Sequence, residues 1–534
     1  MARLAFPRRW WRDAVGYQIY VRSFADSDGD GIGDLGGVRQ HLDHLGWIGV
    51  DALWLTPFYP SPGHDHGYDI SDHCAVDAAL GTLGDFDELV ARAHDLGLRV
   101  LVDIVPNHTS NEHRWFQAAL ADSGDPRRDY YIWRDPAPDG GPPNNWVSNF
   151  GGPAWTLDPV SGQYYLHLFL PEQPDLNWRN PAVRAAFEEI LRFWLARGVD
   201  GFRIDVAHML LKDRELRDNP VAARVVREPG TVDDWNRFEH RHDLDQTGTP
   251  SLYRPWRALA DEAHALLLGE VYLLDAARTA RYVRHDDGLH LTFWFGPLVA
   301  SWNASALRAS LETIAQEGRG RVAWTAGNHD GSRPATRFGG GALGQRRALV
   351  LFTLLAGLPG MPFLYQGDEI GLQDAELSPQ DAQDPIAVRA GEHAAGRDVA
   401  RAPIPWRSGP GSGFTTASRA WLPLGDAPAG GTVEEQRADD GSWLWRYREL
   451  LHARRSLPEL EDGAPQWIEQ PADLLAYRRG PVLVAANLGE QPREPELPPG
   501  RWQVAFSSSR ATGGPLDALE HDSAVVMVDR ASIP

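Results

Sequence analysis

The sequence has almost no cysteine and no long apolar run. Cys74 is the only cysteine in 534 residues, so an internal disulfide cannot form and an oxidising compartment is not indicated. No stretch reaches the about 18 to 20 consecutive apolar residues that a membrane span requires. The basic start of the chain is followed by no apolar segment of the kind found in signal peptides. We therefore expect a cytoplasmic protein without a membrane anchor.

Basic charge is also scarce. The 52 basic residues face 73 acidic ones, which gives a net charge of −21, and Lys212 is the only lysine. A surface of this sign repels phosphate backbones and anionic lipids, so neither nucleic acid nor a membrane surface is an expected partner. The chain is 43% hydrophobic and 23% charged, which is typical of a folded globular protein and excludes wholesale disorder.

Short apolar segments alternate with longer helical stretches over most of the chain, which predicts a parallel α/β fold. Eight such segments favour a (βα)8 TIM barrel, whose functional residues lie where the strands end. A long Pro- and Gly-rich stretch after the third segment predicts an inserted loop-rich subdomain, and the last part of the chain predicts an antiparallel β domain. The expected division is barrel 1–105, subdomain 106–178, barrel 179–456 and β domain 457–534. The predicted barrel strands are Gly16–Val21, Ala52–Thr56, Arg99–Asp103, Gly201–Ile204, Leu266–Glu270, Leu289–Phe293, Val322–Ala326 and Met361–Tyr365.

An aspartate-rich loop follows the first predicted strand. Its oxygen donors have the 1, 3, 5, 7, 9 spacing of a calcium loop, and a glycine at position 6 allows the sharp turn, although the position-12 glutamate of an EF-hand is missing. The segment also fits G-x-G-x-x-G, but its carboxylates would repel a pyrophosphate. We predict a structural Ca²⁺ or Mg²⁺ site; the alternative is a plain Asp-Gly turn. The predicted ligands are Asp26, Asp28, Asp30, the carbonyl of Ile32, and Asp34.

Acidic and histidine side chains stand at the ends of four predicted strands. Because the ends of parallel strands meet at one face of a barrel, we expect these groups to converge there. The residues concerned are Asp103 and His108, Arg203 and Asp205, Glu270, and His329 and Asp330.

Two of these carboxylates have contrasting surroundings. Arg203 and Asp205 share one face of their strand, so the guanidinium is expected to lower the pKa of the Asp205 carboxyl and keep it ionised, as a nucleophile requires. Glu270 follows Leu266-Leu-Leu-Gly269, an apolar strand that would leave its carboxyl poorly solvated and favour the protonated form of a general acid. One charged and one protonated carboxyl form the catalytic pair of a retaining glycosidase. A carboxylate-bound metal centre is the alternative for the same acids.

Several motifs carry a family resemblance that covers nearly the whole chain. Through them the chain resembles glycoside hydrolase family 13, the α-amylase family, and within it the bacterial α-glucosidases and oligo-1,6-glucosidases. The resemblance implies that Asp205 is the nucleophile, Glu270 the general acid/base and Asp330 the third carboxylate, while Arg203, His108 and His329 orient the nucleophile and bind glucose hydroxyls. The motifs are Asp103-Ile-Val-Pro-Asn-His108, Gly201-Phe-Arg-Ile-Asp205-Val206, Gly269-Glu270-Val271, Gly327-Asn-His-Asp330, Gln173-Pro-Asp-Leu-Asn177 and Tyr365-Gln-Gly-Asp-Glu369.

The segment His64-Asp65-His66-Gly67-Tyr68-Asp69 matches the part of this family that binds the terminal glucose. The resemblance implies that Tyr68 stacks on that glucose, that Asp65 binds its far hydroxyls and that Arg401 is the partner of Asp65. A charged pair at this end would prevent a long chain from passing through. We therefore expect exo-action on short substrates; a turn aspartate, a core tyrosine and a surface arginine are the structural alternatives.

The resemblance also bears on linkage. Val206, after the nucleophile, is similar to α-1,6-cleaving relatives, whereas the following Ala207-His-Met-Leu210 is more like the broad-specificity α-glucosidases. Phe150 and Phe169 resemble aromatics near the acceptor site, although either would also fit a core.

Taken together, the residues predict an exo-acting retaining α-glucosidase of short oligosaccharides and disaccharides that needs no cofactor for its chemistry. It would be broad in linkage and able to transglucosylate. One alternative is a transglucosidase or trehalose synthase on the same scaffold. Another, of a different class, is a non-catalytic binding subunit. The presence of all three acids and the absence of a membrane segment in the sequence argue against the second. No oligomeric state follows from the sequence.

Overall fold

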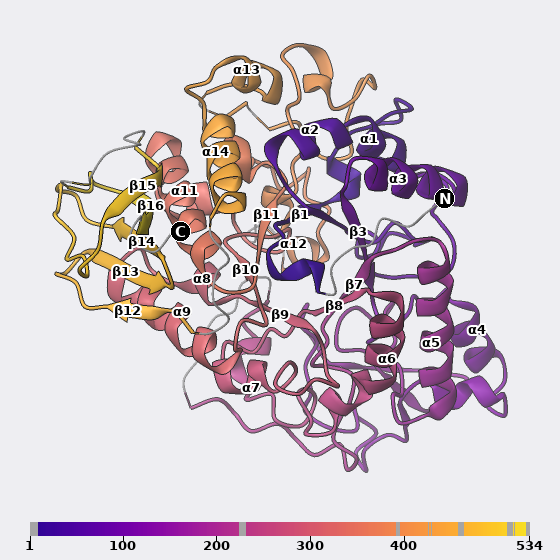
Figure 1. The fold of residues 1–534 in the computed structure, drawn as a ribbon. Helices are drawn as coiled ribbons and strands as arrows, with labels where there is room; N and C mark the ends of the chain where they lie inside the picture. The colour runs from indigo at the N-terminus through magenta and orange to yellow at the C-terminus, as the bar shows by residue number, and fades with distance from the viewer. Residues whose placement is uncertain are drawn as a thin grey trace.

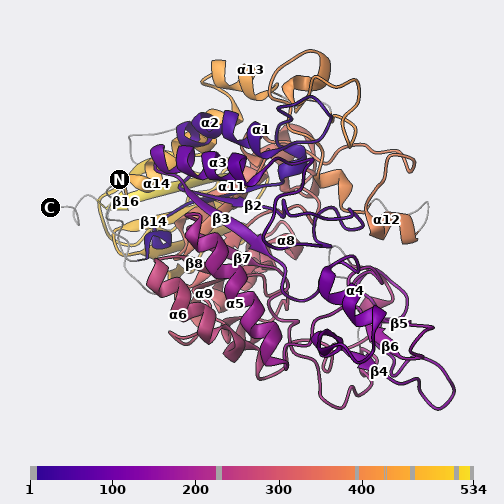
Figure 2. The ribbon, with the colours of Figure 1, turned by 90° about the vertical axis from the view of Figure 1, so that its right-hand side faces the viewer.

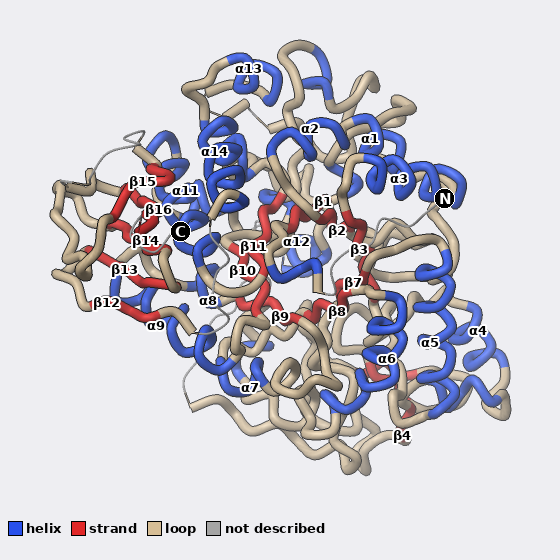
Figure 3. Tube along the Cα trace, viewed as in Figure 1, coloured by secondary structure: helices blue, strands red, loops and turns tan. Residues whose placement is uncertain are grey.

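Eight strands of the described chain close into a parallel barrel, visible as the ring of red segments in Figure 3. The computed structural model describes residues 9–223, 231–390, 396–425, 427–428, 430–457, 464–509, 516 and 518–529, so most of the chain start used for the signal-peptide prediction (1–8) lies outside them. Each predicted segment forms one barrel strand, and the predicted (βα)8 fold is confirmed. The strands are β1 (Gly16–Ile19), β2 (Ala52–Leu55), β3 (Arg99–Ile104), β7 (Gly201–Ile204), β8 (Leu266–Gly269), β9 (Leu291–Trp294), β10 (Val322–Thr325) and β11 (Met361–Tyr365).

The barrel interior is filled by large apolar side chains from alternate strand positions. Leu101, Leu266 and Leu268 belong to one buried cluster with Phe293 and Phe363. Since side chains alternate along a strand, the next inward positions after these leucines fall at the carboxyl ends of β3 and β8. The interior is therefore a packed core that ends in polar groups at the top of the barrel.

Helices surround the barrel in Figure 1, and their ends follow local sequence signals. Thr82 and Asp85 form a reciprocal capping box at the start of α3, and Asn180 caps α5 just before its first residue, Pro181. None of the described helices has the length and apolar character needed to cross a bilayer. The helices are α1 (Leu35–Gln40), α2 (Leu42–Ile48), α3 (Leu83–Asp95), α4 (Arg114–Ala121), α5 (Pro181–Ala196), α6 (Arg254–Ala263), α7 (Ala276–Ala280), α8 (Gly296–Val299), α9 (Ala304–Glu317), α10 (Pro334–Arg337), α11 (Gly341–Gly357), α12 (Pro385–Ala390), α13 (Val433–Ala438) and α14 (Trp443–Arg455).

The stretch between β3 and α5 forms the inserted subdomain, which projects from the barrel at the lower right of Figure 2. Besides loops it contains α4 and a small antiparallel sheet in the order β4 (Trp133–Arg134), β6 (Tyr164–Leu166) and β5 (Trp155–Leu157). At its base, a bridge between His108 and Asp175 joins the end of the subdomain to the loop after β3. This bridge places the subdomain beside the carboxyl ends of the barrel strands.

The C-terminal strands form an antiparallel sheet of order β12-β13-β14-β16-β15, as the sequence predicted. Helix α11 packs between this sheet and the barrel, and the Tyr477 hydroxyl donates a hydrogen bond to the Leu354 carbonyl of that helix. The sequence predicts four of these strands, at Leu474–Tyr477, Val482–Ala486, Trp502–Phe506 and Ala524–Val528. It does not predict β12, because this strand is short and largely solvent-accessible and therefore lacks an apolar run. The strands are β12 (Gln466–Ile468), β13 (Leu474–Arg479), β14 (Val482–Asn487), β15 (Trp502–Ser507) and β16 (Ser523–Asp529).

Candidate active site

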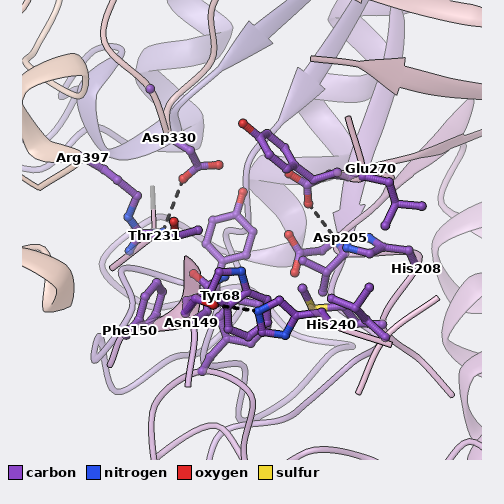
Figure 4. A pocket seen from close by; sticks show the side chains of 18 of the residues that line it. Tyr68, Asn149, Phe150, Asp205, His208, Thr231, His240, Glu270, Asp330 and Arg397 are labelled. Carbon is purple, nitrogen blue, oxygen red and sulfur yellow. Dashed lines mark hydrogen bonds and ion pairs between the residues drawn. The ribbon is translucent and has the colours of Figure 1, made fainter. Parts of the chain in front are cut away.

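The predicted catalytic side chains meet in one cavity at the carboxyl ends of the strands. Figure 4 shows the carboxyl groups of Asp205 and Glu270 close together on one side of this cavity, with Asp330 and Arg397 on the other. The cavity has a volume of about 490 Å³, which lies in the range of small-molecule sites. Ten predicted residues line it: Asp65, Tyr68, His108, Phe150, Phe169, Asp205, Val206, Glu270, His329 and Asp330.

Arg203 lies beneath this cavity and contacts three carboxyl groups. Its Nη1 donates to both oxygens of Asp103 at 3.0 and 3.1 Å and to Asp205 at 2.6 Å, while its Nη2 lies 2.8 Å from a Glu270 oxygen. The guanidinium is 2% exposed and lies over the Trp54 ring. Three carboxyl groups therefore share one buried positive charge.

Burial reverses the expected net shift of one carboxyl. It raises the pKa of the Asp205 carboxyl well above its usual range, and the Arg203 guanidinium, which acts in the opposite direction, does not overcome it. Burial likewise raises the pKa of Asp103 to about 6. The guanidinium lowers the pKa of Asp205 as the sequence predicted, but the predicted net direction is wrong, because the burial of the carboxyl outweighs its charged neighbour.

Asp330 has a different environment from the other two acids. Arg401 donates to its Oδ1 at 3.0 Å, Arg397 lies 3.4 Å from the same oxygen, and His329 Nε2 lies 3.3 Å from Oδ2. Burial acts to raise the pKa of Asp330, but its interactions with His329 and with the guanidinium groups of Arg397 and Arg401 lower it to about 2. This carboxylate is therefore ionised at neutral pH.

The partner predicted for Asp65 is wrong. Arg397, not Arg401, makes the contact, with its Nη2 2.6 Å from Asp65 Oδ1, and it also donates to Asp384 at 2.8 Å. Arg401 lies behind the cavity wall and binds Asp330 and the His329 carbonyl. The two arginines are four residues apart in an irregular stretch, so no helix or strand periodicity indicated which of them points inward.

Tyr68 and His329 form a stacked pair, with ring centroids 5.5 Å apart and an angle of 5° between their planes. The Tyr68 hydroxyl lies 2.9 Å from His329 Nε2, while Gln18 Nε2 lies 2.6 Å from His329 Nδ1. Burial lowers the pKa of His329 well below its usual range and that of His108 to about 3. Both imidazoles are therefore neutral hydrogen-bonding groups.

The remaining wall is largely apolar. Phe150 and Phe169 pack edge-to-face at 5.5 Å and are buried in a local core, so they are core residues and cavity residues at once. The Arg397 guanidinium lies 4.9 Å from the Phe150 ring. Val206 has φ = 34°, a left-handed backbone that a β-branched side chain rarely adopts, and its N–H donates to Glu270 Oε2 at 3.0 Å.

Sequence reasoning missed a second group of lining residues, which come from the loop after β7 and the segments after β8 and β9. His208 and Met209 stand in the Ala207–Leu210 segment, which the sequence analysis considered for linkage and not as cavity lining. The others belong to no motif, and most lie in loops, although Arg278 lies in α7 and Leu298 in α8. The described members of this group are His208, Met209, Thr231, Trp235, Phe238, Glu239, His240, Arg241, Leu244, Tyr272, Leu273, Arg278 and Leu298.

The aspartate-rich loop lies between β1 and α1. Ligand atoms of Asp26, Asp28 and Asp34 come within 4.8 Å of one another. Asp30 is not part of this group, and its carboxylate accepts the N–H of Ile32 at 2.7 Å. Three carboxylates at this separation form a donor set suited to a hard divalent cation, so the residues fit the predicted ion.

A (βα)8 barrel with paired acids at the carboxyl ends of its strands is the architecture of one class of carbohydrate-cleaving enzymes, the barrel glycoside hydrolases. The family model "Alpha amylase, catalytic domain" matches residues 18–463, and the chain belongs to this family, glycoside hydrolase family 13. The family resemblance seen in the sequence is thereby confirmed.

Relatives narrow the activity. A probable alpha-glucosidase of Rhizobium meliloti (strain 1021) is 40% identical, over 93% of this chain and 92% of that protein. A trehalose-6-phosphate hydrolase of Escherichia coli (strain K12) is 39% identical, over 93% and 94%. The crystal structure of the alpha-glucosyl transfer enzyme XgtA is similar, with a TM-score of 0.91 and 40% identity over 98% of this chain and 99% of that one. The chain is a glycoside hydrolase of the α-glucosidase type.

Proposed function

We propose that the protein is a cytoplasmic, exo-acting, retaining α-glucosidase that removes terminal non-reducing glucose from disaccharides and short oligosaccharides. The observation that carries this proposal is the Asp205–Glu270 pair, held by two nitrogens of one guanidinium at 2.6 and 2.8 Å. Because both nitrogens belong to one planar group, the two carboxyls lie close together. A retaining enzyme holds its two carboxyls about 5–5.5 Å apart, and a pair bound to one guanidinium suits that arrangement.

The reaction then follows in two displacements. Asp205 attacks the anomeric carbon while Glu270 donates its proton to the glycosidic oxygen; the carbon–oxygen bond breaks, leaving a β-glucosyl ester and a free leaving group. Glu270 next takes a proton from a water molecule, whose oxygen attacks the anomeric carbon; the ester bond to Asp205 breaks, which releases α-glucose and restores both carboxyl groups. Although burial opposes it, the charges of Asp103 and Glu270 raise the pKa of Arg203 well above its usual range, so this residue stays cationic through both steps.

Exo-action is supported by a buried ion pair at one end of the cavity. The Asp65–Arg397 ion pair is backed by Asp384 and both of its members are buried. Charged hydrogen-bonding groups at this end suit the hydroxyls of a terminal glucose, and such a pair opposes the passage of a continuing chain. We expect Asp65, Arg397 and Asp330 to bind these hydroxyls.

Broad linkage preference and transfer are supported by the apolar lining. Val206, Met209, Phe238, Leu273 and Leu298 line the cavity. Apolar groups contact a sugar or an alcohol without requiring one pattern of hydroxyls, so several leaving groups and acceptors would fit. An acceptor that replaces water in the second displacement yields a new α-glucoside. A transglucosidase or trehalose synthase is therefore the alternative on the same site, and the similarity to an alpha-glucosyl transfer enzyme favours this candidate.

We also propose a structural Ca²⁺ or Mg²⁺ at Asp26, Asp28 and Asp34. Asp34 already caps α1 through its bond to the Gly37 N–H at 2.7 Å, and the Thr415 hydroxyl donates to Asp26. A cation here would join the loop after β1 to the segment around residue 415. It would take no part in the chemistry.

Two variants test the catalytic assignment. Glu270→Gln should lose far more activity on maltose than on an aryl α-glucoside with an acidic leaving group, because only the maltose leaving group requires protonation. Asp205→Asn should lose activity on both, because each needs the nucleophile. Thermal unfolding of both variants controls for the fold. Wild-type kcat in Asp205→Asn would refute the assignment.

A further inference from the structure

Lys212 is a buried ammonium beside the active site that does not line the cavity. Its side chain is 2% exposed, and its Nζ lies 2.6 Å from Asp175 Oδ2 and donates to Asn107 Oδ1 at 2.7 Å and to the Met209 carbonyl. Three acceptors therefore surround one amino group, which has three hydrogens to donate. No proton of the ammonium is left over.

This arrangement fits lysine and not arginine. Lys212 is the only lysine among 52 basic residues, and arginine forms several other buried ion pairs of the described residues, including those of Arg203, Arg333 and Arg397. A guanidinium is planar and spreads its donors over a wide fork, whereas an ammonium directs three donors from one atom. The site around Asp175 requires the compact group.

The three acceptors come from three separate segments. Asn107 lies after β3, Asp175 lies at the base of the inserted subdomain, and Met209 lies in the loop that follows Asp205. Met209 itself lines the cavity. Lys212 therefore fixes the subdomain and the β3 loop relative to the loop that carries the nucleophile.

A continuous set of contacts leads from this ammonium to the glucose-binding groups. Asn107 Nδ2 donates to Asp175 Oδ1 at 3.1 Å, and Asp175 bridges to His108 through the backbone. Gln173 Nε2 lies 3.1 Å from His108 Nε2 and donates to Asp65 Oδ2 at 3.1 Å. A shift of Asp175 would move both His108 and Gln173.

We infer that Lys212 is a positioning residue that sets the place of His108 in the active site by tying Asn107, Asp175 and Met209 together. The inference rests on the proposed glucosidase function, in which His108 binds a hydroxyl of the glucose. Lys212 touches no substrate and acts only through its neighbours. A displacement of about 1 Å at such a group costs up to about 100-fold in rate.

A double-mutant cycle tests the inference. Lys212→Met, His108→Ala and the double variant are compared with wild type for kcat and KM on maltose, with thermal unfolding as a fold control. We expect Lys212→Met to lose about 10- to 100-fold in kcat/KM. The loss should be divided between kcat and KM in the same way as in His108→Ala. In the double variant, Lys212→Met should add little to the loss that His108→Ala causes alone. Arg128→Met is the matched control. It removes another buried cation, which lies in the inserted subdomain with its Nη1 3.5 Å from Oδ2 of Asp158, and it should leave kcat/KM unchanged.

The outcomes are distinguishable. If the losses multiply in the double variant, or if Lys212→Met lowers thermal stability while kcat/KM stays at the wild-type value, the inference is refuted. If Lys212→Met does not fold, Lys212→Arg replaces it in the double-mutant cycle, because arginine keeps the charge but not the three-donor geometry. A wild-type kcat/KM in Lys212→Arg would also refute the inference. Absence of glucose release by the wild type would instead refute the proposed function.

Discussion

Replacing Arg397 is the sharpest perturbation of the end of the cavity that we propose binds the terminal glucose. Arg397→Met removes a buried guanidinium that lies 2.6 Å from Asp65, 2.8 Å from Asp384 and 3.4 Å from Asp330. The three carboxylates would lose a shared counter-charge, and burial would then favour the protonated form of Asp65, whose pKa it already raises. Both the hydrogen bonds to glucose and their orientation would be lost.

The size of the effect follows from the burial of the pair. Two unit charges about 4 Å apart interact by about 4 kcal/mol at an effective dielectric constant of 20. Truncating one partner of a buried, hydrogen-bonded charge pair costs about 2–5 kcal/mol. With 1.36 kcal/mol for each factor of ten, we expect kcat/KM of Arg397→Met to fall roughly 30- to 5,000-fold.

The assay is a pair of double-mutant cycles on kcat/KM with maltose. Asp65→Asn combined with Arg397→Met should be strongly non-additive, because these side chains contact each other. Asp65→Asn combined with Arg401→Met should show much smaller coupling, because Arg401 contacts Asp330 and the His329 carbonyl instead. Stronger coupling to Arg401 than to Arg397, or additive losses with Arg397, would refute this account of the glucose-binding end.

Three further predictions concern pH, the cation and the substrate. Burial lowers the pKa of His73 and of His167 to about 4, whereas the pKa of an unfolded histidine is about 6.5. The free energy of unfolding should therefore be highest above pH 6.5 and fall by up to about 3 kcal/mol for each histidine as the pH falls toward 4. His167→Asn should make the melting temperature fall less steeply over this pH range, and a slope equal to that of the wild type would contradict the reasoning. Adding Ca²⁺ or Mg²⁺ at 100 times its Kd to chelator-treated protein should raise the free energy of unfolding by about 2.7 kcal/mol. Asp28→Asn should abolish this increase, while Asp30→Asn should retain it. Equal behaviour of the two variants would argue against the site. Among the described lining residues the arginines Arg241, Arg278 and Arg397 are each paired with a carboxylate, so their charge is already neutralised and offers little attraction to a phosphate. Trehalose 6-phosphate should therefore have a lower kcat/KM than trehalose or maltose. A preference for the phosphorylated sugar would overturn that expectation.

The barrel was predictable because its strands are buried on both faces and therefore appear as apolar runs. Leu266-Leu-Leu-Gly269 illustrates the pattern: the run ends directly at Glu270, and strand geometry then places that acid at the barrel mouth. Short strand β12 has no such run and was missed. Strand periodicity thus accounts for both the success and the failure.

Strand geometry predicted the site residues that directly follow a strand, whereas loop residues such as Asp65 and Tyr68 were predicted only through the family resemblance. Asp205 and Glu270 follow strands, so their convergence followed from the fold. Arg397 lies in an irregular stretch, and only the folded chain shows that it points inward while Arg401 does not. The net shift in the pKa of Asp205 was mispredicted for a related reason, since the sequence shows the neighbouring Arg203 but not how deeply the carboxyl is buried.

The central claim is that Asp205 and Glu270 act as nucleophile and acid/base of a retaining α-glucosidase. Its most direct test is proton NMR of the purified protein acting on maltose, isomaltose, sucrose and trehalose, with the anomeric signals followed from the first minutes. We predict that α-glucose appears first, from one or more of these sugars, and then mutarotates. Early β-glucose would show inversion and would contradict the roles of both residues, while new glucosides in place of free glucose would identify a transferase.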